Sequence, residues 1–193
     1  MATGLVRTLK NLYQLIKGDS RFSYRLEEID AGSNKVIVCC RGLRTIIKTS
    51  LEEAICNSAL ISGLSPMESC ILGGYFGRAL KNSQHSSREI SKKAGGLSFL
   101  LSNKKGQYCM AFQNRSGEVG YFDQKTKKEF LAHPLEIARN PSLISKFDSS
   151  QACYIGVLAG LNFEKLIQLE NEATKNTKLK KSGSQPPLLR IVK

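Results

Sequence analysis

Cysteine and histidine are the residues of this sequence that could act as nucleophiles, general bases or metal ligands. The chain of 193 residues has six cysteines and two histidines. No two cysteines form a CxxC pair, and neither His85 nor His133 stands near a cysteine, so the paired spacing of zinc ligands is missing. The sequence also has no motif of a phosphate-binding loop, a zinc protease or a serine hydrolase. We therefore expect no catalytic residue, no metal site, no cofactor and no enzymatic activity.

Two of the cysteines, Cys70 and Cys153, stand near the expected starts of helices, where the helix N-terminus can lower the pKa of a thiol. They also lie on the same helical stripe as pairs of glycines. We therefore expect both thiols to be buried and to pack as small apolar side chains.

Positive charge is the second feature that could carry chemistry, because lysine and arginine neutralise phosphate groups. The formal net charge is +13, and basic residues cluster at a connector, at two turns and in the last 21 residues. These clusters predict contact with nucleic acid, DNA or RNA. An acidic protein partner or simple solvated charge remains the alternative. The residues assigned to this contact are Arg41, Arg44, Lys92, Lys93, Lys104, Lys105, Lys125, Lys127, Lys128, Lys178, Lys180 and Lys181.

Aromatic residues near these clusters would strengthen the contact if they stood on an open sheet face, because bases stack on exposed rings. The alternative is that they belong to the core. A separate possibility is that residues 87–95, which follow an expected helix, form the second helix of a helix-turn-helix. The aromatic residues in question are Phe22, Tyr24, Tyr108, Tyr121 and Phe122.

A pattern of Cys, two residues, Gly, three residues and Gly occurs twice, at 70–77 and at 153–160. Each glycine inside a helix costs about 1 kcal/mol relative to alanine, so we expect a close backbone approach that offsets this cost. Our preferred interpretation is that the two helices cross along these stripes about a pseudo-two-fold axis; alternatively, each stripe packs on its own sheet. The residues assigned to the interface between the repeats are Cys70, Gly73, Gly77, Cys153, Gly156 and Gly160.

The same two segments belong to a longer internal repeat. The stretch from Tyr24 aligns with the stretch from Tyr108 with a gap of one residue, which we place after Ala54 and Ala138. Because diverged copies keep positions of structural importance, this match predicts an internal duplication. The matched pairs include Tyr24/Tyr108, Leu51/Leu135, Glu52/Glu136, Ala54/Ala138, Asn57/Asn140, Cys70/Cys153, Gly73/Gly156 and Gly77/Gly160.

Each copy predicts a β-hairpin, a third strand, a short helix and a longer helix. Ser65 with Glu68 forms a capping box before the longer helix of the first copy, and Asp148 with Gln151 takes the same positions in the second. The expected fold is therefore α+β, with two tandem units of a three-stranded antiparallel sheet and two helices that pack as one pseudo-two-fold body. The predicted organisation is an amphipathic helix at 1–19, repeats at 20–82 and 99–172, a basic connector at 83–98 and a disordered basic tail at 173–193.

The N-terminal stretch is interrupted by Arg7, Lys10 and Lys17, and no apolar run approaches the about 20 residues of a membrane helix. We expect a cytoplasmic, non-catalytic regulatory or accessory protein without membrane contact. The favoured partner is nucleic acid, and the sequence leaves room for a homo-oligomer. The alternative is a protein–protein adaptor that uses the duplicated surface and the C-terminal segment PPLLRIV, residues 186–192.

Overall fold

The computed structural model describes residues 23–163, except positions 31, 33, 42–44, 84–86, 103 and 115–116. The helix expected at 1–19 and the tail expected at 173–193 therefore lie outside the described residues. Within the described part, the chain folds as the sequence predicts, into two similar units of a β-sheet followed by helices. This likeness suggests an internal duplication. No helix in this part of the chain is long and apolar enough to cross a membrane.

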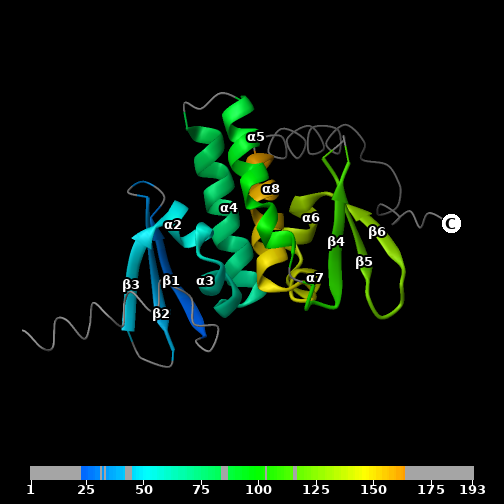
Figure 1. Cartoon of the computed structure of the whole chain (residues 1–193), viewed down its shortest axis with the longest axis horizontal. Helices are drawn as coiled ribbons and strands as arrows, with labels where there is room; N and C mark the ends of the chain where they lie inside the picture. The colour runs from blue at the N-terminus through cyan, green and yellow to red at the C-terminus, as the bar shows by residue number, and fades with distance from the viewer. Residues whose placement is uncertain are drawn as a thin grey trace, which may run out of the picture.

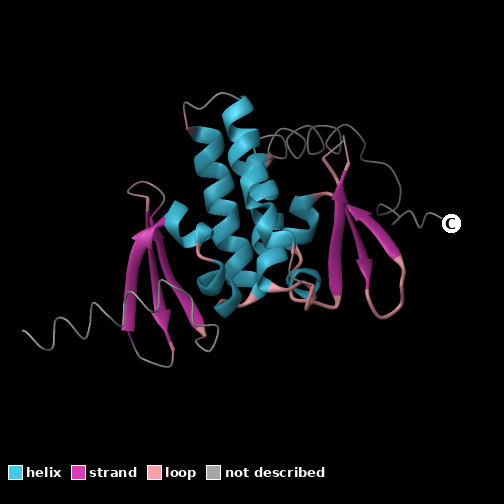
Figure 2. Ribbon diagram, viewed as in Figure 1, coloured by secondary structure: helices cyan, strands magenta, loops and turns pink. Residues whose placement is uncertain are grey.

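Each unit begins with a three-stranded antiparallel sheet in which the strands pair in chain order. Alternation of side chains directs Val36, Val38 and Cys40 of one strand toward the helices, where all three are fully buried. Figures 1 and 2 show the two sheets on opposite sides of a central helical layer. The strands are β1 Tyr24–Asp30, β2 Lys35–Cys40 and β3 Thr45–Ser50 in the first unit, and β4 Tyr108–Gln113, β5 Val119–Asp123 and β6 Glu129–Ala132 in the second.

The expected short helix of each unit is divided in two by an asparagine. Asn57 ends one short helix and caps the next by accepting a hydrogen bond from the N–H of Leu60, and Asn140 does the same with Leu143. The longer helix follows as expected. The helices are α2 Leu51–Cys56, α3 Ser58–Gly63 and α4 Pro66–Asn82, and then α6 Pro134–Arg139, α7 Pro141–Ile144 and α8 Ser149–Leu161.

The gap between the repeats lies in the first hairpin and not after the first helix, so this detail of the sequence alignment is wrong. Ser50 and His133 are equivalent N-caps, and each forms a capping box with the glutamate three residues later. Glu136 therefore corresponds to Glu53 and not to Glu52. Identities between common residues produced the shifted match, whereas the capping geometry fixes the true equivalence.

The helix crossing that the glycine stripes predict is present in the structure. A Cβ added to Gly73 would overlap the carbonyl oxygen of Cys153, and one added to Gly156 would overlap the carbonyl oxygen of Cys70. These contacts are reciprocal because Gly73 and Gly156 are equivalent, as are Cys70 and Cys153. The short helices follow the same symmetry, since α3 contacts α8 and α7 contacts α4. The two units therefore form one body around a pseudo-two-fold axis.

A second paired feature joins each long helix to the first strand of its own unit. Both first strands contain a β-bulge, next to Leu26 in β1 and next to Met110 in β4. Glu68 Oε1 accepts a hydrogen bond of 3.1 Å from the N–H of Leu26, and Gln151 Oε1 accepts one of 2.9 Å from the N–H of Met110. The repeats thus keep one interaction with two different side chains.

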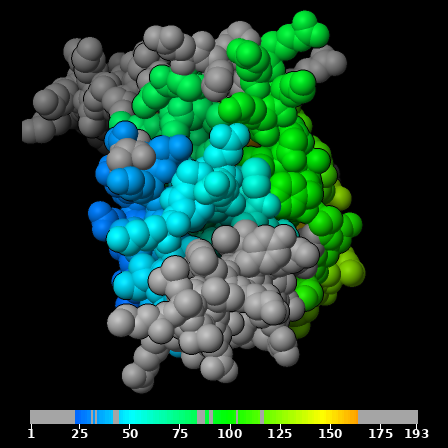
Figure 3. Space-filling view, turned by 60° about the vertical axis from the view of Figure 1, so that its left-hand side comes forward, coloured from blue at the N-terminus to red at the C-terminus, as the bar shows by residue number. Residues whose placement is uncertain are grey.

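The connector between the repeats is helical. Residues Ser87–Gly95 form α5, which continues into the 3₁₀ helix η1, Gly96–Leu101. Leu97 and Leu100 of η1 are buried, and η1 packs against α8. The connector also approaches α2, where Lys93 Nζ of α5 lies 3.6 Å from Glu52 Oε1. In Figure 3 the green surface of the connector lies beside the cyan surface of β3 and α2.

Candidate nucleic-acid interface

Two basic clusters that are separated in the sequence lie next to each other at one end of the second sheet. The side chain of Gln124, in the β5–β6 turn, donates hydrogen bonds of 2.8 Å to the carbonyl oxygen of Lys104 and of 2.7 Å to that of Gly106. The turn and the segment before β4 are therefore tied together. We call the resulting group of five exposed residues the lysine patch; it consists of Lys104, Lys105, Lys125, Lys127 and Lys128.

Asp123 holds the backbone of the turn that carries three of these lysines. Its Oδ1 accepts a hydrogen bond of 2.8 Å from the N–H of Lys125, and its Oδ2 accepts one of 3.3 Å from the side chain of Gln107. Lys127 adopts a left-handed backbone conformation with φ of 58°, which reverses the chain. The patch is thus presented on an ordered turn.

We expect the carboxyl group of Asp123 to titrate below its ordinary pKa of 3.8. Burial opposes its ionisation, but the hydrogen bonds from Lys125, Thr126 and Gln107 outweigh burial and lower the pKa. Because the pKa is lower in the folded state, ionised Asp123 stabilises the fold at pH values above its unfolded-state pKa. This contribution is lost as the pH falls through the folded-state pKa. The stability difference between the wild type and Asp123→Asn, measured by urea unfolding, should therefore shrink as the pH falls below about 4. A difference that does not change with pH would contradict this role.

The other predicted basic residues do not join the lysine patch. Arg41 is exposed directly after β2, and its N–H donates a hydrogen bond to the carbonyl oxygen of Ser23. In the other unit the N–H of Gln124 donates the equivalent bond to the carbonyl oxygen of Gln107. Arg41 therefore belongs to the equivalent turn of the opposite sheet (Figure 1). Lys92 is exposed on α5, and Lys93 is half-buried beside Glu52. The predicted positions Arg44, Lys178, Lys180 and Lys181 lie outside the described residues.

Of the two alternatives for the strand aromatics, the core is the correct one for the three tyrosines, because they are buried and cannot stack on bases. Tyr24, Tyr108 and Tyr121 are 1%, 8% and 6% exposed, respectively. In the second unit the inward face of the sheet forms an aromatic core, in which Tyr108 and Tyr121 pack edge-on against Phe147 with ring centroids 5.8 and 5.4 Å away. Phe122 is half-buried and Phe22 lies outside the described residues.

Sequence reasoning missed two features of the second unit. Phe112 and Leu131 are exposed on the outward face of the second sheet, on either side of Gly120, and the ring of Phe112 covers this glycine. Lys146 Nζ lies 4.9 Å from the centroid of the Tyr108 ring and 3.2 Å from its hydroxyl oxygen. The glycine between two apolar residues across the sheet was a detectable signal, whereas the approach of Lys146 depends on the tertiary fold.

The structure also decides the state of the two stripe cysteines. Burial raises the pKa of Cys70 to about 12, and burial raises that of Cys153 as well. The expected burial of both thiols is therefore confirmed, and burial outweighs any lowering of their pKa values by the helix N-termini. Among the described residues, no group of three or more His, Cys, Asp or Glu side chains could hold a metal ion.

Comparison with known proteins adds no relative: no family model, no curated protein and no solved structure matches this chain significantly. The lysine patch and the pseudo-two-fold body are consequently the observations from which a function can be inferred.

Proposed function

We propose that this chain is a cytosolic, non-catalytic accessory or regulatory protein that contacts the phosphate backbone of nucleic acid through the lysine patch. The observation that supports this proposal is the hydrogen bonding of Gln124 to Lys104 and Gly106, which joins two basic clusters into one surface. Five ammonium groups on an ordered framework suit a row of phosphates, because each lysine acts as a compact point charge.

Because Tyr108 and Tyr121 are buried, we propose contact through the phosphate backbone, for which a duplex is the simplest probe. Single strands are bound mainly through bases that stack on exposed rings, and Tyr108 and Tyr121 have no such exposure. Backbone contact without base stacking is governed by counterion release, so affinity should fall steeply with salt and depend little on sequence.

The first test compares charge-reversed variants of the full chain in binding to a fluorescent duplex. The patch variant carries Lys→Glu at 104, 105, 125 and 128, and the control carries the same change at the exposed positions 35, 48, 81 and 92. We expect the patch variant to lose at least about 100-fold in affinity at low salt, because four phosphate contacts become repulsive. The control, with the same net charge, should lose only a few-fold.

The salt dependence gives a second readout of the same experiment. For the wild type, the logarithm of the binding constant should fall against the logarithm of salt concentration with a slope of about −4, as expected for four to five phosphates. The patch variant should lose most of this slope. Equal losses in the patch and control variants would show that net charge, and not this surface, binds the duplex.

An acidic protein is the alternative partner for the same patch, and the adaptor hypothesis remains a second prediction. The segment PPLLRIV, on which that hypothesis depends, lies outside the described residues. A pull-down from native extract with and without nuclease separates nucleic-acid binding from protein binding. Partners that survive nuclease treatment and are lost when Leu188 and Leu189 are replaced by Asp would favour the adaptor.

A further inference from the structure

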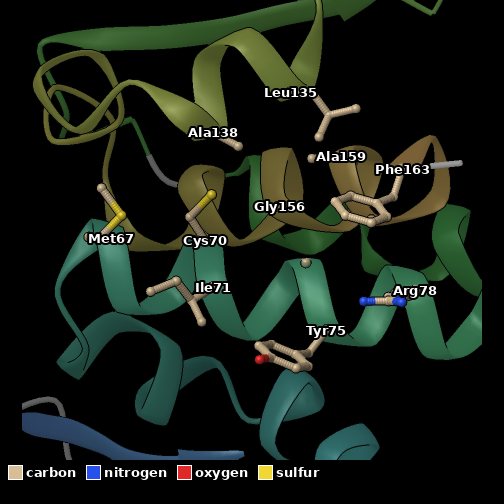
Figure 4. A pocket seen from close by; sticks show the side chains of 12 residues that line it. Met67, Cys70, Ile71, Tyr75, Arg78, Leu135, Ala138, Gly156, Ala159 and Phe163 are labelled. Carbon is tan, nitrogen blue, oxygen red and sulfur yellow. The ribbon is translucent and has the colours of Figure 1, made fainter. Parts of the chain in front are cut away.

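The described residues leave an apolar groove of about 300 Å³ open on one side of the helical layer. It runs between α4 and α6, with α8 as its floor (Figure 4). Ile71 and Tyr75 of α4 are 43% and 41% exposed along it, and the ring of Phe163 lies at one end with the Arg78 guanidinium 5.0 Å from its centroid. Met67 of α4 and Leu135 of α6 also line the groove.

The pseudo-two-fold axis places an equivalent groove between α8 and α2, and there the chain covers it. The cover is η1, whose Leu97 and Leu100 are 4% and 1% exposed and belong to the buried cluster that contains Ile55 and Val157. At the position equivalent to Leu135 of the open groove, Glu52 pairs with Lys93 of the connector.

Equivalent positions show the effect of this cover. Tyr75 on α4 is 41% exposed, whereas its equivalent on α8, Leu158, is 5% exposed. Ile71 is 43% exposed, whereas its equivalent, Tyr154, is half-buried. Burial of apolar surface stabilises a protein by about 25 cal/mol per Å². A segment that covers the open groove, as η1 covers the equivalent groove between α8 and α2, would therefore stabilise the fold.

We propose that residues 164–176 of this chain cover the open groove. In the first unit, the segment that follows α4 covers the groove beside α8; in the second, the segment that follows α8 begins at Phe163, which already lines the groove beside α4. The covering segment of the first unit carries leucines three residues apart, Leu97 and Leu100. The segment EKLIQLENEATKN repeats this spacing at Leu166 and Leu169.

The geometry gives this segment sufficient reach. The groove extends along α4 from Met67 to Arg78, which is about 16 Å at a rise of 1.5 Å per residue. Thirteen residues span this length even as a helix, and the chain continues to residue 193. In the sequence Glu164 directly follows Phe163, and its charge is opposite to that of Arg78. This inference is independent of the lysine patch.

The test measures how fast a thiol in the groove is labelled in the full chain. In a Tyr75→Cys variant, the introduced thiol should be labelled at least about 10-fold more slowly than in the same variant carrying Leu166→Asp and Leu169→Asp. The matched control carries Leu188→Asp and Leu189→Asp, which lie outside the proposed segment, and should keep the protection. The rate should not depend on protein concentration.

Native cysteines report whether each variant is folded, because Cys40 and Cys153 are fully buried and Cys56 is exposed. If Cys153 becomes reactive, Leu166→Ala with Leu169→Ala replaces the aspartate pair and should still release the introduced thiol. A thiol at position 75 that reacts as fast as Cys56 would overturn the proposal. Protection that survives both changes in 164–176 would also overturn it. Protection that increases with protein concentration would overturn it and assign the groove to a second copy.

Discussion

Gly73→Ala is expected to lower the free energy of unfolding by about 3 kcal/mol, although alanine is the better helix former. The added methyl group would overlap the carbonyl oxygen of Cys153 on the crossing helix. This oxygen belongs to the backbone of α8, so it cannot rotate away as a side chain would. The two helices must separate, which also disturbs the reciprocal contact of Gly156 with Cys70. Urea unfolding followed by circular dichroism measures the loss.

The neighbouring Gly74 supplies a matched control on the same helix. The nearest neighbour of a Cβ at this position is the carbonyl oxygen of Gly156, at the ordinary contact distance of 3.8 Å. Gly74→Ala should therefore stabilise the protein by up to about 1 kcal/mol through helix propensity alone. Equal stability of the two alanine variants would mean that α4 and α8 do not cross as described. Gly156→Leu extends the test, because a side chain of this size should prevent the crossing and the cooperative unfolding transition.

Gln151→Ala is expected to lower the free energy of unfolding by about 2 kcal/mol. The side chain of Gln151 is fully buried, and its Oε1 accepts the hydrogen bond from the N–H of Met110 at the bulge of β4. Alanine would leave this N–H without an acceptor inside the protein. An unsatisfied buried donor costs about 1–3 kcal/mol, and the cavity left by the amide adds to it. Denaturant unfolding gives the value, and amide exchange at Met110 gives a local readout.

The other repeat provides the control for this prediction. Glu68 makes the equivalent bond to Leu26, and the first unit therefore tolerates an ionised acceptor there. Burial opposes ionisation of Glu68, yet hydrogen bonds from Ser65 and Leu26 lower its pKa below the ordinary value. Glu68→Gln should keep the bond to Leu26 through its one amide oxygen, but it replaces Oε2, which accepts a hydrogen bond from the N–H of Ser65, with an NH2 donor. We therefore expect a loss of about 1 kcal/mol from the capping box, smaller than that of Gln151→Ala. A loss as large as that of Gln151→Ala would show that the bond to Leu26 is not kept.

The elements and the crossing could be predicted from the sequence because local physics fixes them. Ser65 as N-cap, a proline at the first helical position and Glu68 define the start of α4 through local interactions alone. Glycines at 73 and 77 destabilise a helix unless another backbone packs closely against them. The second set, at 156 and 160, identifies the helix that does so. The identities at 51–54 misplaced the gap, because glutamate and leucine are common near helix starts and do not record hydrogen-bond register.

The site residues were only partly predictable. Alternation within a strand places Tyr108 and Tyr121 on the opposite sheet face from the residues next to them in the chain. It does not show which face the helices cover, and both rings proved to be buried in the core. The two parts of the lysine patch are clear in the sequence as separate clusters. Their union depends on Gln124, a residue with no local signature, which bonds to carbonyl groups 18 and 20 positions away.

The sequence by itself determined two similar units, their strands and helices, and the bare stripes along which α4 and α8 meet. Each of these follows from interactions between residues close in the chain, or from glycines whose helical cost needs an offset. The tertiary structure alone decided which aromatics are buried, which lysines share a surface, and that the described residues cover one of two equivalent grooves and leave the other open. These depend on contacts between distant segments, and a pattern along the chain carries no information about which face another segment will cover.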